Sequence, residues 1–166
     1  MSRFVVCRLK GKVMSMRLYL VQHGEAQSEA EDPERPLTFR GEEETGKISG
    51  AAKRLDIRPS RLYHSGKKRA EQTAGIIARA LDLSAQLGQG LNPNDDVRPW
   101  VERISREAQD LMIVGHLPFL EKLASFLVCG DEGAKIVLFR YSAILCLEKK
   151  EPGRWAVDWV LKPEMV

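Results

Sequence analysis

Three short strings in this sequence join histidine or arginine to glycine at the ends of apolar runs. The strings are Gln22-His23-Gly24, the stretch from His64 to Arg69, and Gly115-His116. A neutral imidazole held in one tautomer is a good nucleophile, and a guanidinium fork matches the oxygens of a transferring phosphoryl group. If the fold brings His23, Arg69 and His116 together, these side chains are suited to phosphoryl transfer.

The residues around these strings add groups that favour a bound anion. Gly24 permits a phosphate to approach the backbone closely, and a helix that begins near Gly66 offers free N–H groups. Lys67 and Lys68 stand at the same helix start, where positive charge is unfavourable unless an anion binds, although plain solvated charge also explains them. The expected phosphate contacts are Gln22, Gly24, Arg69 and His116, with Arg35, His64 and Lys67 at the pocket rim. His64 is equally compatible with a structural role.

Short apolar runs that alternate with helical periodicity must position these residues. Strands are predicted at residues 18–21, 61–64, 111–114, 136–139, 143–147 and 155–160. Helices are predicted after Thr38, over residues 70–81, over residues 97–108, and after Pro118. Trp155, Val157 and Trp159 alternate with smaller or polar neighbours, which predicts a half-exposed edge for the last strand.

This alternation predicts the α/β class, with a three-layer α/β/α sandwich whose central sheet is mostly parallel and has helices on both faces. Ligands of such sheets bind beyond the carboxyl ends of the strands. Because each of the three strings follows a predicted strand, we expect them to meet at one edge of the sheet.

A length of 166 residues and a hydrophobic content of 43% indicate one globular domain, assigned to residues 16–166. Residues 1–15 are too short and too broken by basic residues for a secretory signal. They are interpreted as a disordered leader or, alternatively, as an extra edge strand over residues 3–9. The sequence contains no run of about eighteen apolar residues, so no membrane span is predicted.

Charge and cysteine usage exclude several kinds of partner and site. A net charge of +3 with mixed signs does not predict nucleic-acid binding. Cys7, Cys129 and Cys146 lack CxxC spacing, which favours reduced, buried thiols in a cytoplasmic protein. The histidines lack metal-ligand spacing such as HExxH, so no metal site is predicted. Asp95 and Asp96 are interpreted as helix caps, with a proton-donor role as the alternative.

Taken together, the strings resemble those of the histidine phosphatase superfamily, also called phosphoglycerate mutase-like, over about residues 16–160. More narrowly, the sequence is similar to the short bacterial phosphohistidine phosphatases of the SixA type. The resemblance is carried, in chain order, by His23-Gly24, Arg35-Pro36-Leu37-Thr38 with Gly41, Ser65, Arg69-Ala70-Glu71-Gln72-Thr73, and Gly115-His116-Leu117-Pro118.

The resemblance implies roles for the site residues and a class of substrate. His23 matches the nucleophile that becomes phosphohistidine, Arg69 the second arginine of the phosphate pocket, and His116 a histidine that donates a hydrogen bond to the phosphoryl oxygens. It implies no cofactor, and a substrate that is a phosphohistidine-bearing protein or a small phosphorylated molecule. Larger members carry an inserted glutamate as proton donor, for which this chain has no room. The nitrogen leaving group of a phosphoramidate such as phosphohistidine departs without a strong acid. A short chain without the inserted glutamate therefore favours phosphohistidine as the substrate.

One position departs from the family pattern, since the first motif reads Arg-His-Gly and this chain has Gln22. A hydrogen bond to a charged group contributes about 1.5–3 kcal/mol, which is on the order of 10- to 100-fold in rate. Lys67, Lys68 or Arg35 are candidates to replace the missing charge. Two alternatives to a phosphohistidine phosphatase follow. One is a phosphate- or phosphoprotein-binding module without turnover, and the other is a broad phosphatase for small-molecule esters.

Overall fold

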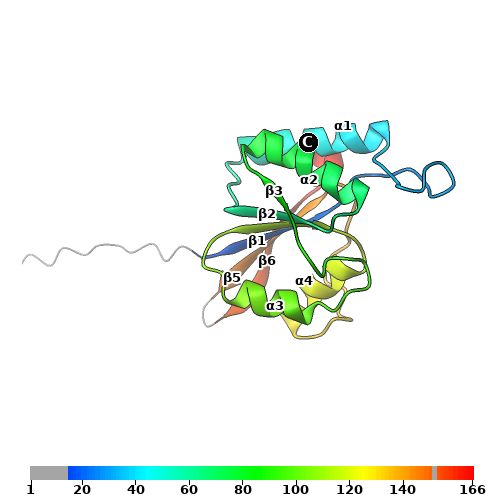
Figure 1. Cartoon of the computed structure of the whole chain (residues 1–166). Helices are drawn as coiled ribbons and strands as arrows, with labels where there is room; N and C mark the ends of the chain where they lie inside the picture. Colours follow the sequence, from blue (N-terminus) through cyan, green and yellow to red (C-terminus); the bar gives the residue numbers. More distant parts are fainter. Residues whose placement is uncertain (1–14, 151–152) are drawn as a thin grey trace, which may run out of the picture.

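A six-stranded sheet forms the centre of the molecule (Figure 1), in the order β3-β2-β4-β1-β5-β6. The computed structural model describes residues 15–150 and 153–166. The predicted leader or edge strand at residues 1–15 therefore lies, apart from Ser15, outside the described residues. The strands are β1 (Arg17–Gln22), β2 (Arg61–His64), β3 (Ala85–Leu87), β4 (Leu111–Gly115), β5 (Ile144–Lys150) and β6 (Arg154–Leu161).

Helices cover both faces of this sheet (Figure 1). On one face lie α1 (Phe39–Arg54) and α2 (Lys68–Leu81), on the other α3 (Arg98–Ser105) and α4 (Phe119–Cys129), and a short 3-10 turn, η1 (Pro163–Met165), follows the last strand. The pairings β1–β4, β4–β2 and β2–β3 are parallel, whereas β5 is antiparallel to both of its neighbours. The predicted three-layer α/β/α sandwich with a mostly parallel sheet is confirmed.

The central strands are apolar throughout because each one serves two cores. Leu18 and Leu20 of β1 face the core under α3 and α4, whereas Tyr19 and Val21 face the core under α1 and α2. Strands that are buried on both faces lose the alternation of apolar and polar residues and become continuous apolar runs. This pattern explains why the sequence placed β1 and β4 correctly.

Local capping explains where α1 and α4 begin and end. The Thr38 hydroxyl accepts a hydrogen bond from the Gly41 N–H at 3.0 Å, as predicted for the N-cap of α1. Asp96 accepts from the Arg98 N–H at 3.0 Å, but the predicted cap was wrong in position, since the N-cap of α3 is Val97 and it makes no side-chain capping bond. The helix ends at Ser105, before the predicted Ala108. Gly130, with φ of 72°, closes α4 in the left-handed conformation.

Two strand predictions were wrong. Residues 136–139 form no strand, although Phe139 is buried and Ile136 and Val137 pack against the same core. Their apolar pattern reflects burial without a free sheet edge to pair with, since β5 occupies the position beside β1. The short strand β3 was missed because its three residues are mostly exposed and show no apolar pattern. Its parallel pairing with β2 creates it.

The edge position of β6 is confirmed, but its tryptophans do not share one face. Trp155 packs in the core under α3 and α4, and Trp159 packs against the other core. A β-bulge opposite Cys146 and Leu147 shifts the register between them. The expectation of buried thiols holds for Cys146 but not for Cys129, which is exposed. The helical phase that buries Leu120 and Leu123 turns residue 129 away from the core.

Two glycines of α1 give a matched test of this packing. A Cβ at Gly41 would lie 2.1 Å from the carbonyl oxygen of Glu25, whereas a Cβ at Gly46 meets nothing within 4 Å. We therefore predict that Gly41→Ala lowers the free energy of unfolding by about 1–3 kcal/mol through overpacking. Gly46→Ala should raise it by about 0.5–1 kcal/mol through helix propensity. Urea denaturation of both variants checks this, and a Gly41→Ala protein as stable as wild type would contradict it.

Candidate functional site

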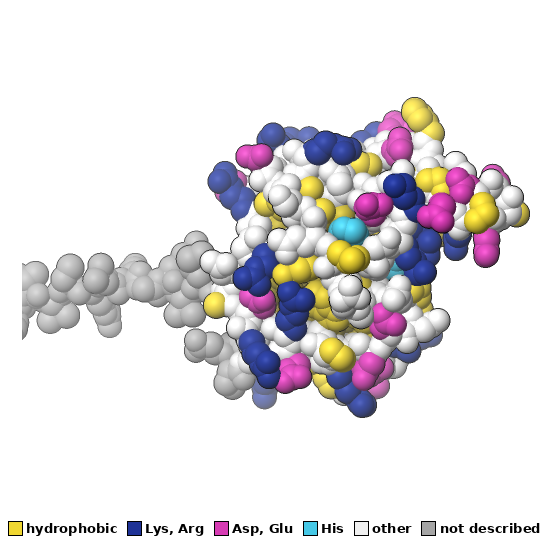
Figure 2. Space-filling view, in the orientation of Figure 1, with side chains coloured by type: hydrophobic (Ala, Val, Ile, Leu, Met, Phe, Trp, Pro, Cys, Tyr) yellow, Lys and Arg dark blue, Asp and Glu magenta, His cyan; other side chains and the backbone are white. Residues whose placement is uncertain are grey.

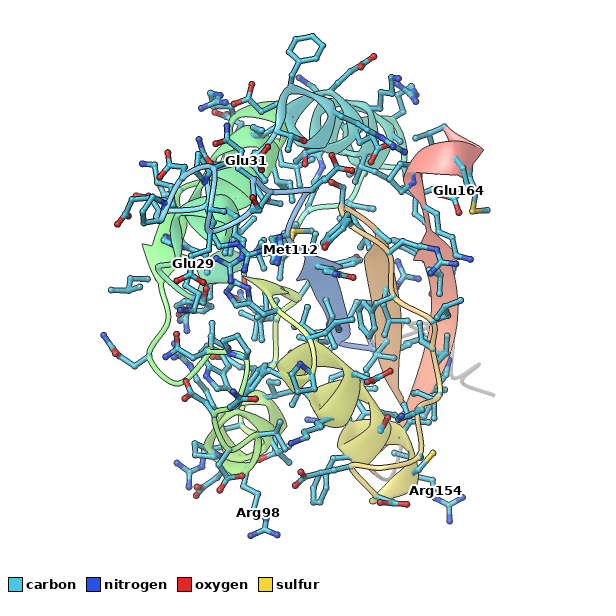
Figure 3. All side chains as sticks on the ribbon, turned by 90° about the vertical axis from the view of Figure 1, so that its right-hand side faces the viewer. Glu29, Glu31, Arg98, Met112, Arg154 and Glu164 are labelled. Atoms are coloured by element: carbon cyan, nitrogen blue, oxygen red, sulfur yellow. The ribbon has the colours of Figure 1, made fainter. Side chains whose placement is uncertain are left out.

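Three neighbouring strands end at the same level, and this alignment brings the predicted residues together. Gln22 at the end of β1 pairs with Gly115 of β4, and His64 at the end of β2 pairs with Val114. The His23 N–H extends the ladder by donating to the carbonyl oxygen of Gly115 at 3.0 Å. Figure 3 views the molecule from this edge, with the loop of Glu29 and Glu31 on one side and Glu164 on the other. We call it the catalytic edge.

His23 is held in one tautomer. Its Nδ1 lies 2.7 Å from the carbonyl oxygen of Gly24, and because a carbonyl only accepts, Nδ1 must carry the proton. Nε2 then keeps its lone pair, and the Nε–H of Arg69 donates to it at 3.3 Å. Burial is the main cause that lowers the pKa of His23 to about 4; the Gly24 carbonyl opposes this shift, and the charges of Arg69 and Arg35 add to it. At neutral pH the ring is therefore uncharged, with the lone pair of Nε2 free of a proton.

Arg69 reaches His23 from the first turn of α2. The Thr73 hydroxyl, one turn later, donates to the Arg69 carbonyl oxygen at 2.7 Å and accepts from the Gly24 N–H at 2.9 Å. Both polar backbone groups of Gly24 are thus bonded within the protein, one to Thr73 and one to His23. Gly24 therefore holds the His23 ring in place through its carbonyl oxygen, and its predicted contact with phosphate stays a prediction. A Cβ there would lie 2.8 Å from Thr45 Oγ1.

His116 completes the group from the end of β4. Its ring centroid lies 4.9 Å from that of His23, and its Nε2 lies 2.5 Å from the Ser65 hydroxyl. The ring is only 1% exposed, and within the described residues its Nδ1 has no hydrogen-bond partner. Burial, then the charges of His23, Arg69, Lys67 and Arg35, lower the pKa of His116 to about 3. A buried, neutral imidazole with a free nitrogen is equipped to meet a polar ligand.

The rim contains cations close to both histidines. Arg35, at a φ of 49°, closes the loop from Gln27 to Pro36 and donates from Nε to the Gln27 carbonyl oxygen at 3.1 Å. Its charge lowers the pKa of His23, Arg69 and His116 alike, which requires that it stand near all three. Lys67 is exposed at the start of α2, and its charge also acts on His116. The expected rim positions of Arg35 and Lys67 fit these effects.

Acidic side chains surround this basic centre on the outer side. The loop from Gln27 to Pro36 projects beyond the catalytic edge (Figure 1), and acidic groups gather on it in Figure 2. The acidic residues of the loop are Glu29, Glu31, Asp32 and Glu34. The Gln27 N–H closes the base of the loop by donating to the Pro36 carbonyl oxygen at 2.8 Å. The cations near His23 are thus flanked by an acidic loop.

Gln22 and His64 occupy the two remaining expected positions. The Gln22 side chain is 9% exposed, and in the described part of the chain its Oε1 has no hydrogen-bond partner. Because Oε1 only accepts, this free atom is not a phosphate contact, and a contact from Gln22 would have to come from its Nε2. His64, by contrast, accepts the Gly66 N–H on its Nδ1 at 3.2 Å, and burial lowers its pKa. That bond stabilises the turn between β2 and α2.

Four residues near His23 were not assigned a role from the sequence: Ser65, Thr73, Tyr141 and Ser142. Ser65 and Thr73 belong to the string that carries the family resemblance, so their positions were visible although their partners were not. The Tyr141 ring lies 5.6 Å from that of His23, and the Ser142 N–H donates to the Gln22 carbonyl oxygen at 3.0 Å. No pattern in the sequence indicated that the segment before β5 returns to the catalytic edge.

Carboxylates and metals have no visible part in this group. Within residues 15–150 and 153–166, no hydrogen bond or ion pair joins His23, Arg69 or His116 to a carboxylate. The Asp95 carboxylate accepts from the Asn92 N–H at 2.7 Å, which fits a capping role in its loop. In the same described ranges, no cluster of three or more His, Cys, Asp or Glu side chains is arranged to hold a metal ion. None of the described helices is long and apolar enough to cross a membrane.

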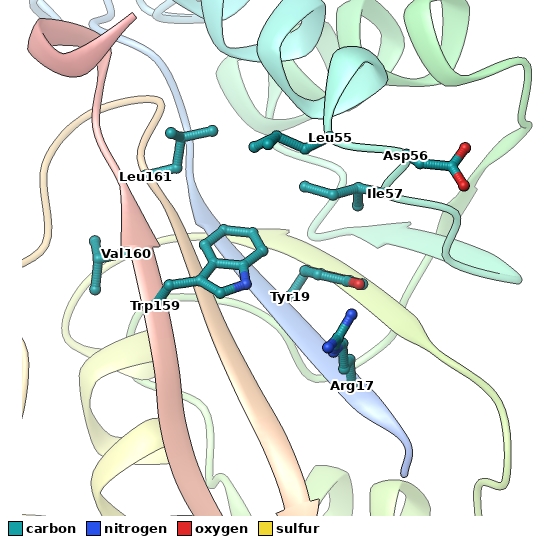
Figure 4. A pocket seen from close by; sticks show the side chains of 8 residues that line it. All are labelled: Arg17, Tyr19, Leu55, Asp56, Ile57, Trp159, Val160 and Leu161. Atoms are coloured by element: carbon teal, nitrogen blue, oxygen red, sulfur yellow. The ribbon is translucent and has the colours of Figure 1, made fainter. Parts of the chain in front are cut away.

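A second hollow lies between the end of α1 and the outer face of the sheet (Figure 4). It measures about 320 Å³, and Tyr19, Trp159, Leu55 and Ile57 form its apolar walls. Arg17 and Asp56 supply its charged side chains. Because no histidine lines it and it adjoins the first residues of β1, it is separate from the catalytic edge.

Comparison with known proteins agrees with this geometry. Residues 18–110 match the model of the histidine phosphatase superfamily, branch 1. An uncharacterized protein of Picosynechococcus sp. is 35% identical over 126 residues, covering 71% of this chain and 76% of that protein. The phosphohistidine phosphatase SixA of Escherichia coli K12 is 28% identical and covers 89% of this chain and 94% of its own length.

A solved structure extends the likeness to three dimensions. The protein histidine phosphatase SixA in complex with tungstate superposes with a TM-score of 0.79 at 27% identity, covering 90% of this chain and 99% of that one. The matched length leaves no large insertion in either protein, in keeping with the short chain. From its sequence and from its fold, this protein belongs to branch 1 of the histidine phosphatase superfamily and is a phosphatase.

Proposed function

We propose that this protein hydrolyses phosphohistidine on a protein substrate through a covalent phosphohistidine at His23. The observation that carries the proposal is the fixed tautomer of His23, whose unprotonated Nε2 faces the guanidinium of Arg69. A neutral nucleophile beside a cationic phosphate ligand is what phosphoryl transfer needs. The similarity to SixA supports the choice of phosphohistidine as substrate.

The reaction has two steps. First, the His23 Nε2 lone pair forms a bond to phosphorus while the bond from phosphorus to the substrate imidazole breaks, and the protonated imidazole leaves as a neutral ring. Arg69 turns from Nε2 to the phosphoryl oxygens, and His116 donates a hydrogen bond to them. Second, a water molecule attacks phosphorus, the bond to Nε2 breaks, and inorganic phosphate leaves.

The leaving group explains why no acid is needed at the centre. The carboxylate closest in sequence, Glu25, accepts a hydrogen bond from the Thr38 hydroxyl at 3.0 Å and lies 3.9 Å from Arg40. Its carboxylate is therefore engaged by Thr38 and Arg40, within the groove that Tyr141 also lines. A phosphoramidate nitrogen accepts its proton before departure, whereas the oxygen of an alkyl ester needs an acid in the transition state. This difference favours phosphohistidine over alkyl esters.

Turnover of a phosphohistidine-bearing protein, without added metal, tests the proposal. Wild type should release phosphate, and His23→Ala should lower the rate on the order of 10³-fold or more because the nucleophile is lost. Brief mixing with labelled substrate should leave an alkali-stable, acid-labile label on His23. Release of phosphate by the His23→Ala protein at the wild-type rate would exclude the covalent step.

Gln22 favours a second candidate, a module that binds phosphate without turnover. We predict that Gln22→Arg raises kcat/KM on the order of 10- to 100-fold, because a guanidinium adds charge and a second donor toward the phosphoryl oxygens. Gln86→Arg, on the exposed edge strand β3, adds the same charge away from the site and is the matched control. Equal activity of Gln22→Arg and wild type would mean that Arg35 already replaces the charge. Binding of phosphate with no turnover in either protein would favour the module.

The neutral histidines predict a pH dependence of stability. The pKa values of His23 and His116 fall from 6.5 to about 4 and about 3 in the folded protein. Below pH 6.5 the unfolded chain binds protons that the folded chain does not, so stability is full above that pH and declines as the pH falls. Each unit of pKa shift corresponds to about 1.4 kcal/mol. Urea denaturation from pH 7 to 4 should show this decline, and His116→Asn should flatten it. Identical slopes would contradict the burial of a neutral ring.

A further inference from the structure

We propose that Tyr141 forms the wall against which the leaving group rests, so that the site prefers a flat aromatic leaving group to an alkyl one. This inference rests on the proposed function and adds the residue that distinguishes the imidazole of phosphohistidine from an aliphatic alcohol. Tyr141 lies in the segment before β5 and is 43% exposed, a large fraction for an aromatic side chain beside buried histidines.

The backbone next to Tyr141 is held in place relative to His23. The next residue, Ser142, is fully buried and adopts a φ of 60°. Its N–H donates to the Gln22 carbonyl oxygen at 3.0 Å, and its hydroxyl lies 2.8 Å from that of Thr45 in α1. The backbone beside Tyr141 is therefore tied both to the end of β1 and to α1. These bonds fix the point of the chain from which the Tyr141 ring extends toward His23.

The Tyr141 ring packs beside the ring of His23, where an aromatic leaving group can reach it. The ring is tilted by 37° to the His23 ring at a centroid distance of 5.6 Å, within the range of favourable aromatic pairs. Burial and then the charge of Arg35 lower the pKa of Arg69, and the Tyr141 phenol opposes this shift. The Arg69 guanidinium itself contacts His23 Nε2. In an in-line displacement the leaving atom stands opposite Nε2 across the phosphorus. A ring bonded to that atom meets the exposed part of Tyr141.

The space beyond Tyr141 accommodates the rest of a large substrate. A groove of about 530 Å³ opens there, between Arg40 and Lys47 of α1 and the side chains of Arg140 and Glu164. Figure 3 labels Glu164, one of the residues that line this groove. A polypeptide that carries the leaving imidazole can continue along these charged side chains, so Tyr141 separates the reacting group from the remainder of the substrate.

Two non-hydrolysable ligands test this wall without requiring turnover. Phenylphosphonate and butylphosphonate carry the same anionic group with a flat or an aliphatic substituent. We expect wild type to bind phenylphosphonate about fivefold more tightly than butylphosphonate, in line with the contribution of an aromatic pair. Tyr141→Ala should reduce this ratio to about one, whereas Tyr141→Phe, which keeps the ring, should restore it. Calorimetric titration measures the dissociation constants.

Leu138→Ala is the matched control, because Leu138 is exposed in the same segment and is 64% accessible. It should leave both dissociation constants unchanged, and circular dichroism checks that the Tyr141 variants fold. The inference is overturned if the ratio of the two dissociation constants in Tyr141→Ala equals that of wild type. It is also overturned if Tyr141→Ala weakens the binding of both phosphonates equally. Wild type that shows the aromatic preference but does not hydrolyse phosphohistidine overturns the proposed function alone. Wild type that binds neither phosphonate overturns both.

Discussion

The hydrogen bond from His23 Nδ1 to the Gly24 carbonyl oxygen determines what the rest of the site can do. It is a bond within one dipeptide, and it fixes the proton on Nδ1 and leaves the lone pair on Nε2, as the proposed attack on phosphorus requires. It holds only while the Gly24 backbone is held, and Thr73 of α2 does this through the Gly24 N–H. Close packing of α1 against residues 24 and 25 leaves space for glycine alone at positions 24 and 41. The tautomer of one ring thus depends on two helices and a strand.

The site combines uncharged histidines with nearby cations. Burial and nearby cations keep His23 and His116 uncharged, while the same cations form a region that attracts a dianion. The histidines therefore contribute lone pairs and dipoles, and Arg69, Arg35 and Lys67 contribute charge. With Gln22 in place of an arginine, more of that charge comes from side chains outside the strand end. Because these cations come from a loop and from the start of α2, their distance from phosphorus depends on how those segments are held.

The parallel sheet brings these histidines and cations together. β1, β2 and β4 end within one residue of each other in register, so side chains from distant parts of the chain face a common point. The antiparallel β5 then returns the chain past the same edge, and the irregular segment before it places Tyr141 against His23. The chain thus contributes an aromatic wall from a region that contains no regular secondary structure.

By itself, the sequence determined the layers of the fold, the strands β1, β2 and β4, and the meeting of His23, Arg69 and His116, because buried parallel strands and helix caps leave strong local patterns. Only the tertiary structure decided the roles of Gly24, Ser65 and Tyr141, since these depend on hydrogen bonds and ring contacts between residues far apart in the chain. The same reason explains the errors at residues 136–139 and at β3. An apolar run reports burial, but pairing with a neighbouring strand depends on which edges of the sheet are free.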